Sequence, residues 1–259
     1  MSGSVVAMPD QPPYLQPFVL DPTPVEPLEA DGADGSEAVD LYLPGPDPAP
    51  AVVLVHGGPV SPDVSSMPRQ WPVFRGYGSL LARAGIAAAM FDHRFHHYAD
   101  LPESQRRVEE VVDLVRARPE VDPDRVVVWF FSGGGLLTGP WLCEAPSWLR
   151  GVAMTYPALG ATPDEKLSVV SPAEAVCDSA PPLLVTRVGH EREELAGHVA
   201  AFLARAAEVG AGVDVIDVPD GRHGFDHRQP GRASAAAVRE ALTWAQRVLD
   251  APQASRQPF

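Results

Sequence analysis

The chain has 259 residues, of which 45% are hydrophobic and 21% charged, a composition typical of a globular protein with one large α/β domain or two small ones. The net charge of −14 repels phosphate backbones and anionic lipid surfaces, so neither nucleic acid nor a membrane is expected as a partner. No apolar run approaches the roughly 20 residues that span a bilayer, and the first residues lack the basic start and apolar core of a signal peptide.

The only two cysteines are Cys143 and Cys177, and two lone thiols predict neither a disulfide framework nor a zinc site. A reducing cytoplasm is the simplest location for such a chain, so a cytoplasmic protein is predicted. The sequence leaves open whether the chain forms a homodimer.

Seven prolines within residues 1–27 forbid a helix there and predict an extended N-terminal arm. We expect a strap or a loose tail, with a dimerising or site-covering arm as the alternative. Residues 37–45 alternate well enough for an early strand, which is expected to pair with residues near 25–30 across the turn at 31–35.

From residue 51 onward, apolar runs alternate with segments of helical period, which predicts βαβ units and a mostly parallel sheet with helices on both faces. The chain is expected to be a single domain over 28–250, with a C-terminal tail at 251–259 and a small cap or lid at 158–180. The predicted strands are 51–58, 86–92, 125–131, 149–157, 181–189 and 213–219, and the predicted helices are 74–85, 103–118, a segment after the glycines at 133–135, 193–210 and about 230–250.

In parallel sheets, ligands bind at the carboxyl ends of the strands, and one of these ends carries an unusual sequence. The stretch "RVVVWFFSGGGLL" runs from a buried strand into Ser132 and three glycines. A strand, a serine and small residues form a nucleophile elbow, in which a sharp turn lifts the hydroxyl out of the sheet edge. The usual pattern is G-x-S-x-G, and Phe130 replaces its first glycine here. The alternative is a plain helix entry with Ser132 as the N-cap.

Two further strand ends carry a histidine and carboxylates. His223 lies in the loop between the last strand and the final helix, where it is the candidate general base, although a lone loop histidine is more often simply solvated. A carboxylate must orient this base and stabilise the imidazolium, and Glu191 is the preferred candidate because it follows the strand ending near Val188. The alternative acids are Asp164, Asp178 and Asp220, and Glu191 could also be an ordinary carboxylate at a helix N-terminus.

The first buried strand ends in "HGGPV", a glycine-rich loop whose backbone N–H groups could hold a developing oxyanion. Gly57 or Gly58 is the candidate for one donor, and Gly133 for the other. A simple strand-end turn is the alternative reading of this loop. The order glycine pair, serine, acid and histidine along the chain is that of α/β-hydrolases and differs from the two common protease orders.

Residues 40–250 resemble the α/β-hydrolase superfamily and, within it, the dienelactone-hydrolase-like and small serine esterase branch. The resemblance rests on these residues and on the segments "VVLVHGGP", "GIAAAMFDHR", "VDPDRVVVWFFSGGG", "PPLLVTRVGHE" and "GRHGFD". The resemblance implies an eight-stranded, mostly parallel sheet and hydrolysis of carboxylic esters or lactones. It implies Ser132 as nucleophile, His223 as base and Glu191 as acid. Dienelactone hydrolases proper use a cysteine nucleophile, so that exact activity is not expected.

The segment at 61–74 follows the glycine loop and is expected to cover the pocket, with Pro59, Trp71 and Phe74 as candidate substrate-binding residues. Arg69 and Arg75 could meet a substrate carboxylate. His93, His96 and His97 gather in one loop, but no partner cluster accompanies them, so no metal is predicted, and the expected chemistry requires no cofactor.

The predicted function is therefore that of a serine hydrolase acting on small-molecule esters or lactones through an acyl-enzyme on Ser132. The same three residues could instead serve a peptidase, or an acyltransferase or cyclase of a biosynthetic pathway. A catalytically silent hydrolase fold used for binding is the alternative from another class.

Overall fold

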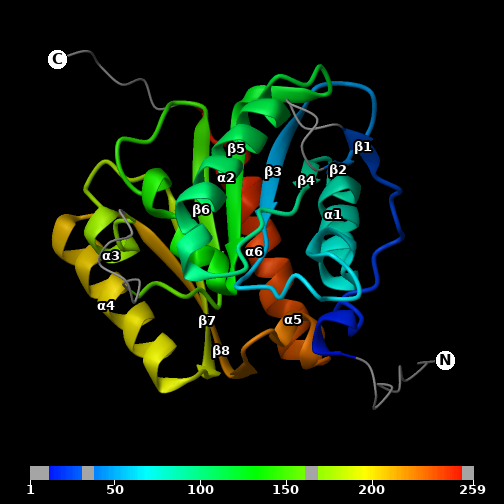
Figure 1. Cartoon of the computed structure of the whole chain (residues 1–259). Helices are drawn as coiled ribbons and strands as arrows, with labels where there is room; N and C mark the ends of the chain where they lie inside the picture. The colour runs from blue at the N-terminus through cyan, green and yellow to red at the C-terminus, as the bar shows by residue number, and fades with distance from the viewer. Residues whose placement is uncertain (1–11, 31–37, 161–168, 253–259) are drawn as a thin grey trace, which may run out of the picture.

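A single eight-stranded sheet organises the part of the chain that the computed structural model describes, residues 12–30, 38–160 and 169–252 (Figure 1). The spatial order is β1-β2-β4-β3-β5-β6-β7-β8. The strands are β1 (Leu28–Ala30), β2 (Val39–Tyr42), β3 (Ala49–Val55), β4 (Ala87–Met90), β5 (Val121–Phe131), β6 (Leu149–Thr155), β7 (Leu183–His190) and β8 (Val213–Arg222).

The first two strands are the antiparallel part of the sheet. β1 pairs with β2, and β2 pairs with β4, both in antiparallel register, whereas the neighbours from β4 to β8 are all parallel. The predicted pairing of residues near 25–30 with 37–45 is confirmed, and the turn predicted at 31–35 lies outside the described residues. The central strands are buried on both faces, as their continuous apolar runs predict.

Helices cover both faces of the sheet and bury its alternating side chains. Val53 and Val55 of β3 belong to the core cluster that contains the apolar faces of α2 (Leu101–Arg116) and α4 (Glu193–Val209). The intervening Val52 and Leu54 belong to the opposite cluster, with α1 (Pro72–Arg83) and α6 (Arg232–Asp250). Figure 1 shows α2 in front of the strands and α6 behind them. None of the described helices is long and apolar enough to span a bilayer.

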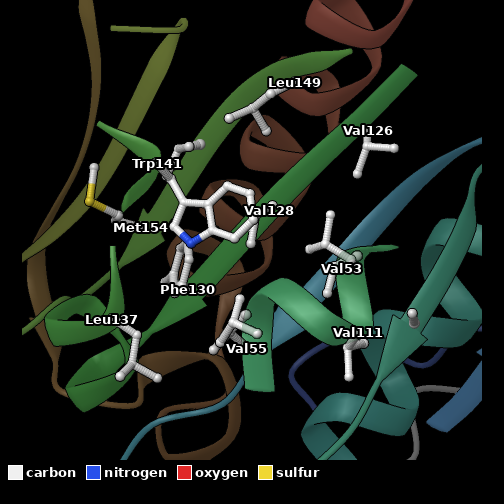
Figure 2. Packing of buried hydrophobic residues seen from close by; sticks show 14 of the residues in the cluster. Val53, Val55, Val111, Val126, Val128, Phe130, Leu137, Trp141, Leu149 and Met154 are labelled. Carbon is white, nitrogen blue, oxygen red and sulfur yellow. The ribbon is translucent and has the colours of Figure 1, made fainter. Parts of the chain in front are cut away.

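The residue that departs from the usual serine motif is part of this core. Phe130 is fully buried, and Figure 2 shows it close to Leu137, Trp141 and Met154 on the α2 side of the sheet. The position two residues before Ser132 therefore faces a packed apolar cluster with room for an aromatic ring.

The segment after the three glycines differs from the prediction. Ser132–Leu137 and Gly139–Trp141 form two short 3₁₀ helices, η4 and η5, where the sequence predicted a helix. Glycine costs about 1 kcal/mol per residue in a helix interior, and Pro140 removes a backbone donor, so this stretch cannot sustain a regular α-helix. The other short helices are α3 (Pro172–Ala175), α5 (Phe225–Arg228), η1 (Pro13–Leu15), η2 (Pro68–Gln70) and η3 (Tyr98–Asp100).

Cys143 and Cys177 form a disulfide, contrary to the prediction from their number. They are 34 residues apart in the sequence, but the segment after η5 meets the end of α3, where the N–H of Cys177 donates to the carbonyl oxygen of Leu142. Only the tertiary fold creates this proximity. Because disulfides persist mainly in oxidising compartments, the cysteines no longer support the cytoplasmic location, which stays a prediction.

The disulfide closes a long loop, so its loss should destabilise the fold mainly by freeing the unfolded chain. We expect the Cys143→Ser, Cys177→Ser double variant to lose roughly 2–4 kcal/mol of unfolding free energy in urea denaturation. Dithiothreitol should lower the midpoint of the wild type and leave that of the double variant unchanged. Equal midpoints for the two proteins without reductant would contradict the bond's stabilising role.

Candidate active site

The register of the parallel sheet brings three distant segments to the same edge. His190, the last residue of β7, pairs with Arg222, the last residue of β8. The residues that follow the two strands, Glu191 and His223, therefore leave the sheet side by side. A Cβ atom at Gly189 would overlap the backbone of Pro219, so only glycine permits this close approach of the two strand ends. β5, which ends immediately before Ser132, lies in the same parallel sheet and points the same way.

Ser132, His223 and Glu191 form a continuous hydrogen-bonded chain. The Ser132 hydroxyl donates to His223 Nε2 over 2.6 Å, and His223 Nδ1 donates to Glu191 Oε2 over 2.5 Å. This assignment leaves one lone pair on Nε2, directed at the serine hydroxyl, and fixes the tautomer through the carboxylate. The side chain of Glu191 is 6% exposed and that of His223 is 23% exposed, so the pair is largely shielded from water.

The carboxylate of Glu191 stays ionised despite its burial. Desolvation opposes its charge, but hydrogen bonds from His223 and from the backbone N–H of Arg192 outweigh this cost and lower the pKa of Glu191. Of the alternative acids, Asp178 and Asp220 are exposed, and Asp164 lies outside the described residues. Glu191 is thus the candidate carboxylate that the structure brings to His223.

Ser132 occupies a strained turn. Its φ of 50° is in the left-handed region that residues other than glycine rarely adopt. The strand before it is extended and the 3₁₀ helix η4 begins at it, so the chain reverses sharply at this one residue. This strand, strained residue and short helix match the geometry predicted for a nucleophile elbow at Ser132.

The glycines beside Ser132 permit close contact with the loop after β3. β3 ends at Val55, three residues before its predicted end, so Gly57 and Gly58 lie in a loop. A Cβ at Gly133 would overlap the carbonyl oxygen of Gly58, and a Cβ at Gly57 would come within 2.9 Å of that of Ser132. The backbones of Gly57, Gly58 and Gly133 therefore surround the serine with no intervening side chain.

A cavity of about 220 Å³ opens onto Ser132 and His223. Pro59, Trp71 and Phe74, the predicted substrate-binding residues, all line it. The remaining lining is mostly apolar or glycine and comprises Gly57, Gly58, Val60, Val73, Phe131, Tyr156, Gly224, His227 and Arg228. Among the described parts of the predicted lid, 158–160 and 169–180, no residue lines this cavity, and residues 161–168 lie outside the described chain.

Tyr156 and Asp226 are neighbours of the site that the sequence analysis missed. The Tyr156 ring packs beneath that of His223, with ring centroids 4.8 Å apart. Its hydroxyl donates to the fully buried carboxylate of Asp226 over 2.9 Å, and Tyr77 donates to the same carboxylate over 3.0 Å. Burial and this carboxylate raise the pKa of both tyrosines well above its ordinary value, so both hydroxyls remain donors. The available signal was position, since Tyr156 is near the carboxyl end of the strand predicted at 149–157 and Asp226 lies three residues after His223.

The histidine-rich loop supports the glycine loop. The rings of His56 and His93 are buried and stacked with centroids 3.6 Å apart, and His93 Nε2 donates to the carbonyl oxygen of His56 over 2.8 Å. Burial lowers the pKa of both, to about 4 for His93, so both are neutral near pH 7. His96 donates to the carbonyl oxygen of Val60, and His97 is exposed.

Metal-binding and carboxylate-binding roles gain no support from the geometry. Within the described residues, no group of three or more histidine, cysteine, aspartate or glutamate side chains is arranged to hold a metal ion. Arg69 pairs with Asp40 and Asp92, and Arg75 pairs with Glu26, so both arginines already meet carboxylates of the protein.

The chain matches no protein-family model and no curated protein. Its structure is similar to solved structures of an esterase from the Planctomycetes species Thermogutta terrifontis. The native form of that enzyme, Est2, has a TM-score of 0.70 and 19% identity, over 86% of this chain and 92% of that one. The form phosphoramylated by tabun has a TM-score of 0.69 and 20% identity, over 88% and 95% of the two chains. The form with butyrate bound has a TM-score of 0.67 and 19% identity, over 86% and 93%.

These similarities, together with the eight-stranded and mostly parallel sheet, show that the chain has the α/β-hydrolase fold predicted from its sequence. They do not specify the dienelactone-hydrolase-like branch, which stays a prediction.

The contact between Gly133 and Gly58 predicts a steric effect of a single methyl group. Gly133→Ala should lower the unfolding free energy by about 1–3 kcal/mol in urea denaturation, because the new Cβ overlaps a backbone carbonyl that cannot move freely. Gly197→Ala is the matched control, since it lies within α4 with open space around it and should raise stability by up to about 1 kcal/mol. Equal effects of the two changes would contradict the packing described.

The lowered pKa of Glu191 predicts a pH-dependent contribution to stability. A carboxyl whose pKa is lower in the folded state than in the unfolded state stabilises the fold when it is ionised. This contribution is complete at pH values above the unfolded-state pKa of about 4.5, and it is lost as the pH falls through the folded-state pKa. The stability difference between wild type and Glu191→Gln should therefore be largest near pH 7 and shrink towards about pH 3. Urea unfolding across this range measures it, and a difference that does not change with pH would refute the assigned shift.

Proposed function

We propose that the protein is a serine hydrolase that cleaves small carboxylic esters or lactones through an acyl-enzyme on Ser132. The single observation that carries the proposal is the chain of hydrogen bonds of 2.6 Å and 2.5 Å from Ser132 through His223 to Glu191. It lies at the carboxyl edge of an α/β-hydrolase sheet, beside an apolar cavity and a glycine-rich loop.

In the first half of the reaction, the lone pair of His223 Nε2 takes the proton of the Ser132 hydroxyl as the oxygen attacks the carbonyl carbon. The carbonyl π electrons move onto oxygen, and the backbone N–H groups of Gly133 and of Gly57 or Gly58 stabilise this oxyanion. When the tetrahedral species collapses, the bond to the alcohol oxygen breaks and His223 donates its proton to that oxygen.

In the second half, water enters beside the acyl-enzyme and His223 takes one of its protons while the oxygen attacks the acyl carbon. Collapse breaks the bond to Ser132 Oγ, which recovers its proton from His223, and the carboxylic acid leaves. Each half-reaction passes through a charged imidazolium. The ionised Glu191 stabilises this charge and holds the ring in place, in keeping with its lowered pKa.

The dimensions of the site favour a small acyl group. A cavity of about 220 Å³ lined mainly by Trp71, Phe74, Phe131 and other apolar groups suits a short aliphatic chain. Structures of the similar Thermogutta esterase carry propionate or butyrate, and others are phosphorylated by paraoxon or phosphonylated by sarin. We therefore favour esters of short-chain carboxylic acids as substrates.

The proposal is tested with a panel of ethyl acetate, ethyl butyrate, a small lactone and a matched amide, on wild type and Ser132→Ala. The wild type should hydrolyse the esters or the lactone, and Ser132→Ala should lose roughly a thousandfold or more in kcat/KM. Ser61→Ala, an exposed serine outside the cavity, is the matched control and should retain activity. Activity that survives in Ser132→Ala, or a complete absence of turnover in the wild type, would reject the proposal.

A further inference from the structure

A second and larger cavity lies beside the proposed catalytic cavity. Its volume is about 570 Å³. Arm residues between 16 and 26 form one wall, the first two turns of α1 form another, and His227, Arg228 and Pro230 form the third. Figure 1 shows η1, at the start of this arm, next to α5. The lining is mainly apolar, with several prolines, and the volume falls within the usual range of ligand pockets in proteins.

The arm that encloses this cavity is held in place at several points. The N–H of Val19 donates to the carbonyl oxygen of Asp226 over 2.7 Å, and the N–H of Val25 donates to Ser79 Oγ over 3.0 Å. The Phe18 ring packs on Tyr77 with centroids 4.7 Å apart. These contacts anchor the arm on both sides of the cavity, so the wall is preformed and little ordering is needed when a ligand binds.

The two cavities share His227 and Arg228 as lining residues. Both belong to α5, four and five residues after His223 in the sequence. His227 is fixed by the contact of its Nδ1 with Asp226 over 2.9 Å. Arg228 is exposed, and none of the ion pairs among the described residues involves it.

The reaction itself determines which part of an ester faces this wall. His223 must deliver its proton to the alcohol oxygen, so the alcohol portion lies on the His223 side of the scissile bond. The smaller cavity, which opens onto Ser132, remains for the acyl portion. α5 begins two residues after His223 and carries both shared lining residues, so the cavity under the arm borders the catalytic cavity at this wall. The smaller volume is thus available to the acid and the larger one to the alcohol.

We propose that the cavity under the arm binds the alcohol portion of the substrate. The enzyme then prefers esters of a short acid with a large apolar alcohol over esters of a long acid with a small alcohol. This inference rests on the proposed esterase function and assigns a specificity role to arm residues 16–26, at the opposite end of the chain from His223.

The first test compares two isomeric esters, octyl acetate and ethyl octanoate, which contain the same atoms on opposite sides of the ester bond. The wild type should hydrolyse octyl acetate with at least tenfold higher kcat/KM. Equal values, or a preference for ethyl octanoate, would overturn the inference. Ser132-dependent hydrolysis of ethyl acetate would in that case leave the proposed function standing, whereas turnover of no ester at all would remove both.

The second test fills the cavity. Leu20 lines it, so Leu20→Trp should lower the ratio of kcat/KM for octyl acetate to that for ethyl acetate about tenfold, mainly through KM. Leu28→Trp is the matched control, because Leu28 is an exposed residue of β1 outside both cavities, and its ratio should equal that of wild type. Val25→Phe fills the same cavity from another arm position and keeps the test decisive if Leu20→Trp does not fold. An unchanged ratio in a folded filling variant would overturn the inference.

Discussion

The hydrogen bond from Ser132 to His223 is the interaction on which the proposed chemistry depends, and the sheet makes it available. Parallel pairing sends β5, β7 and β8 to the same edge, and the pairing of His190 with Arg222 places Glu191 and His223 next to each other. A slip of one residue between β7 and β8 would turn one of the two side chains to the opposite face. Precise register therefore determines whether a carboxylate reaches the imidazole.

Two sets of contacts hold the hydrogen-bonded residues Ser132, His223 and Glu191 in place. The Tyr156 ring lies under His223 and is anchored through its hydroxyl to the buried Asp226, which also holds the N-terminal arm through its backbone carbonyl. Beside Ser132, the absence of side chains at Gly57, Gly58 and Gly133 lets the loop after β3 approach η4 within backbone contact. Both arrangements restrict the side chains of the proposed site, and in the proposed reaction such preorganisation lowers the cost of reaching the transition state.

The fold could be predicted from the sequence because its signals are local. Continuous apolar runs mark the central buried strands, Ser132 follows such a run directly, and Glu191 and His223 lie within a few residues of the ends of two later predicted strands. The 3₁₀ helices at Ser132–Leu137 and Gly139–Trp141 differ from the helix predicted after the glycines, because neither the glycines nor Pro140 can sustain a regular α-helix. Two contacts depend on segments that meet only in the folded chain, so the sequence pattern does not predict them. They are the disulfide between Cys143 and Cys177 and the hydrogen bond of Tyr156 with Asp226.

The central claim is that the geometry around Ser132 makes this one hydroxyl a nucleophile, and covalent labelling measures that most directly. The protein would be treated with paraoxon, and the modified peptide would be located by mass spectrometry. The account predicts a single diethylphosphoryl group on Ser132, with labelling at least a hundredfold slower in His223→Ala. A label on another residue, or the same labelling rate in both proteins, would contradict it.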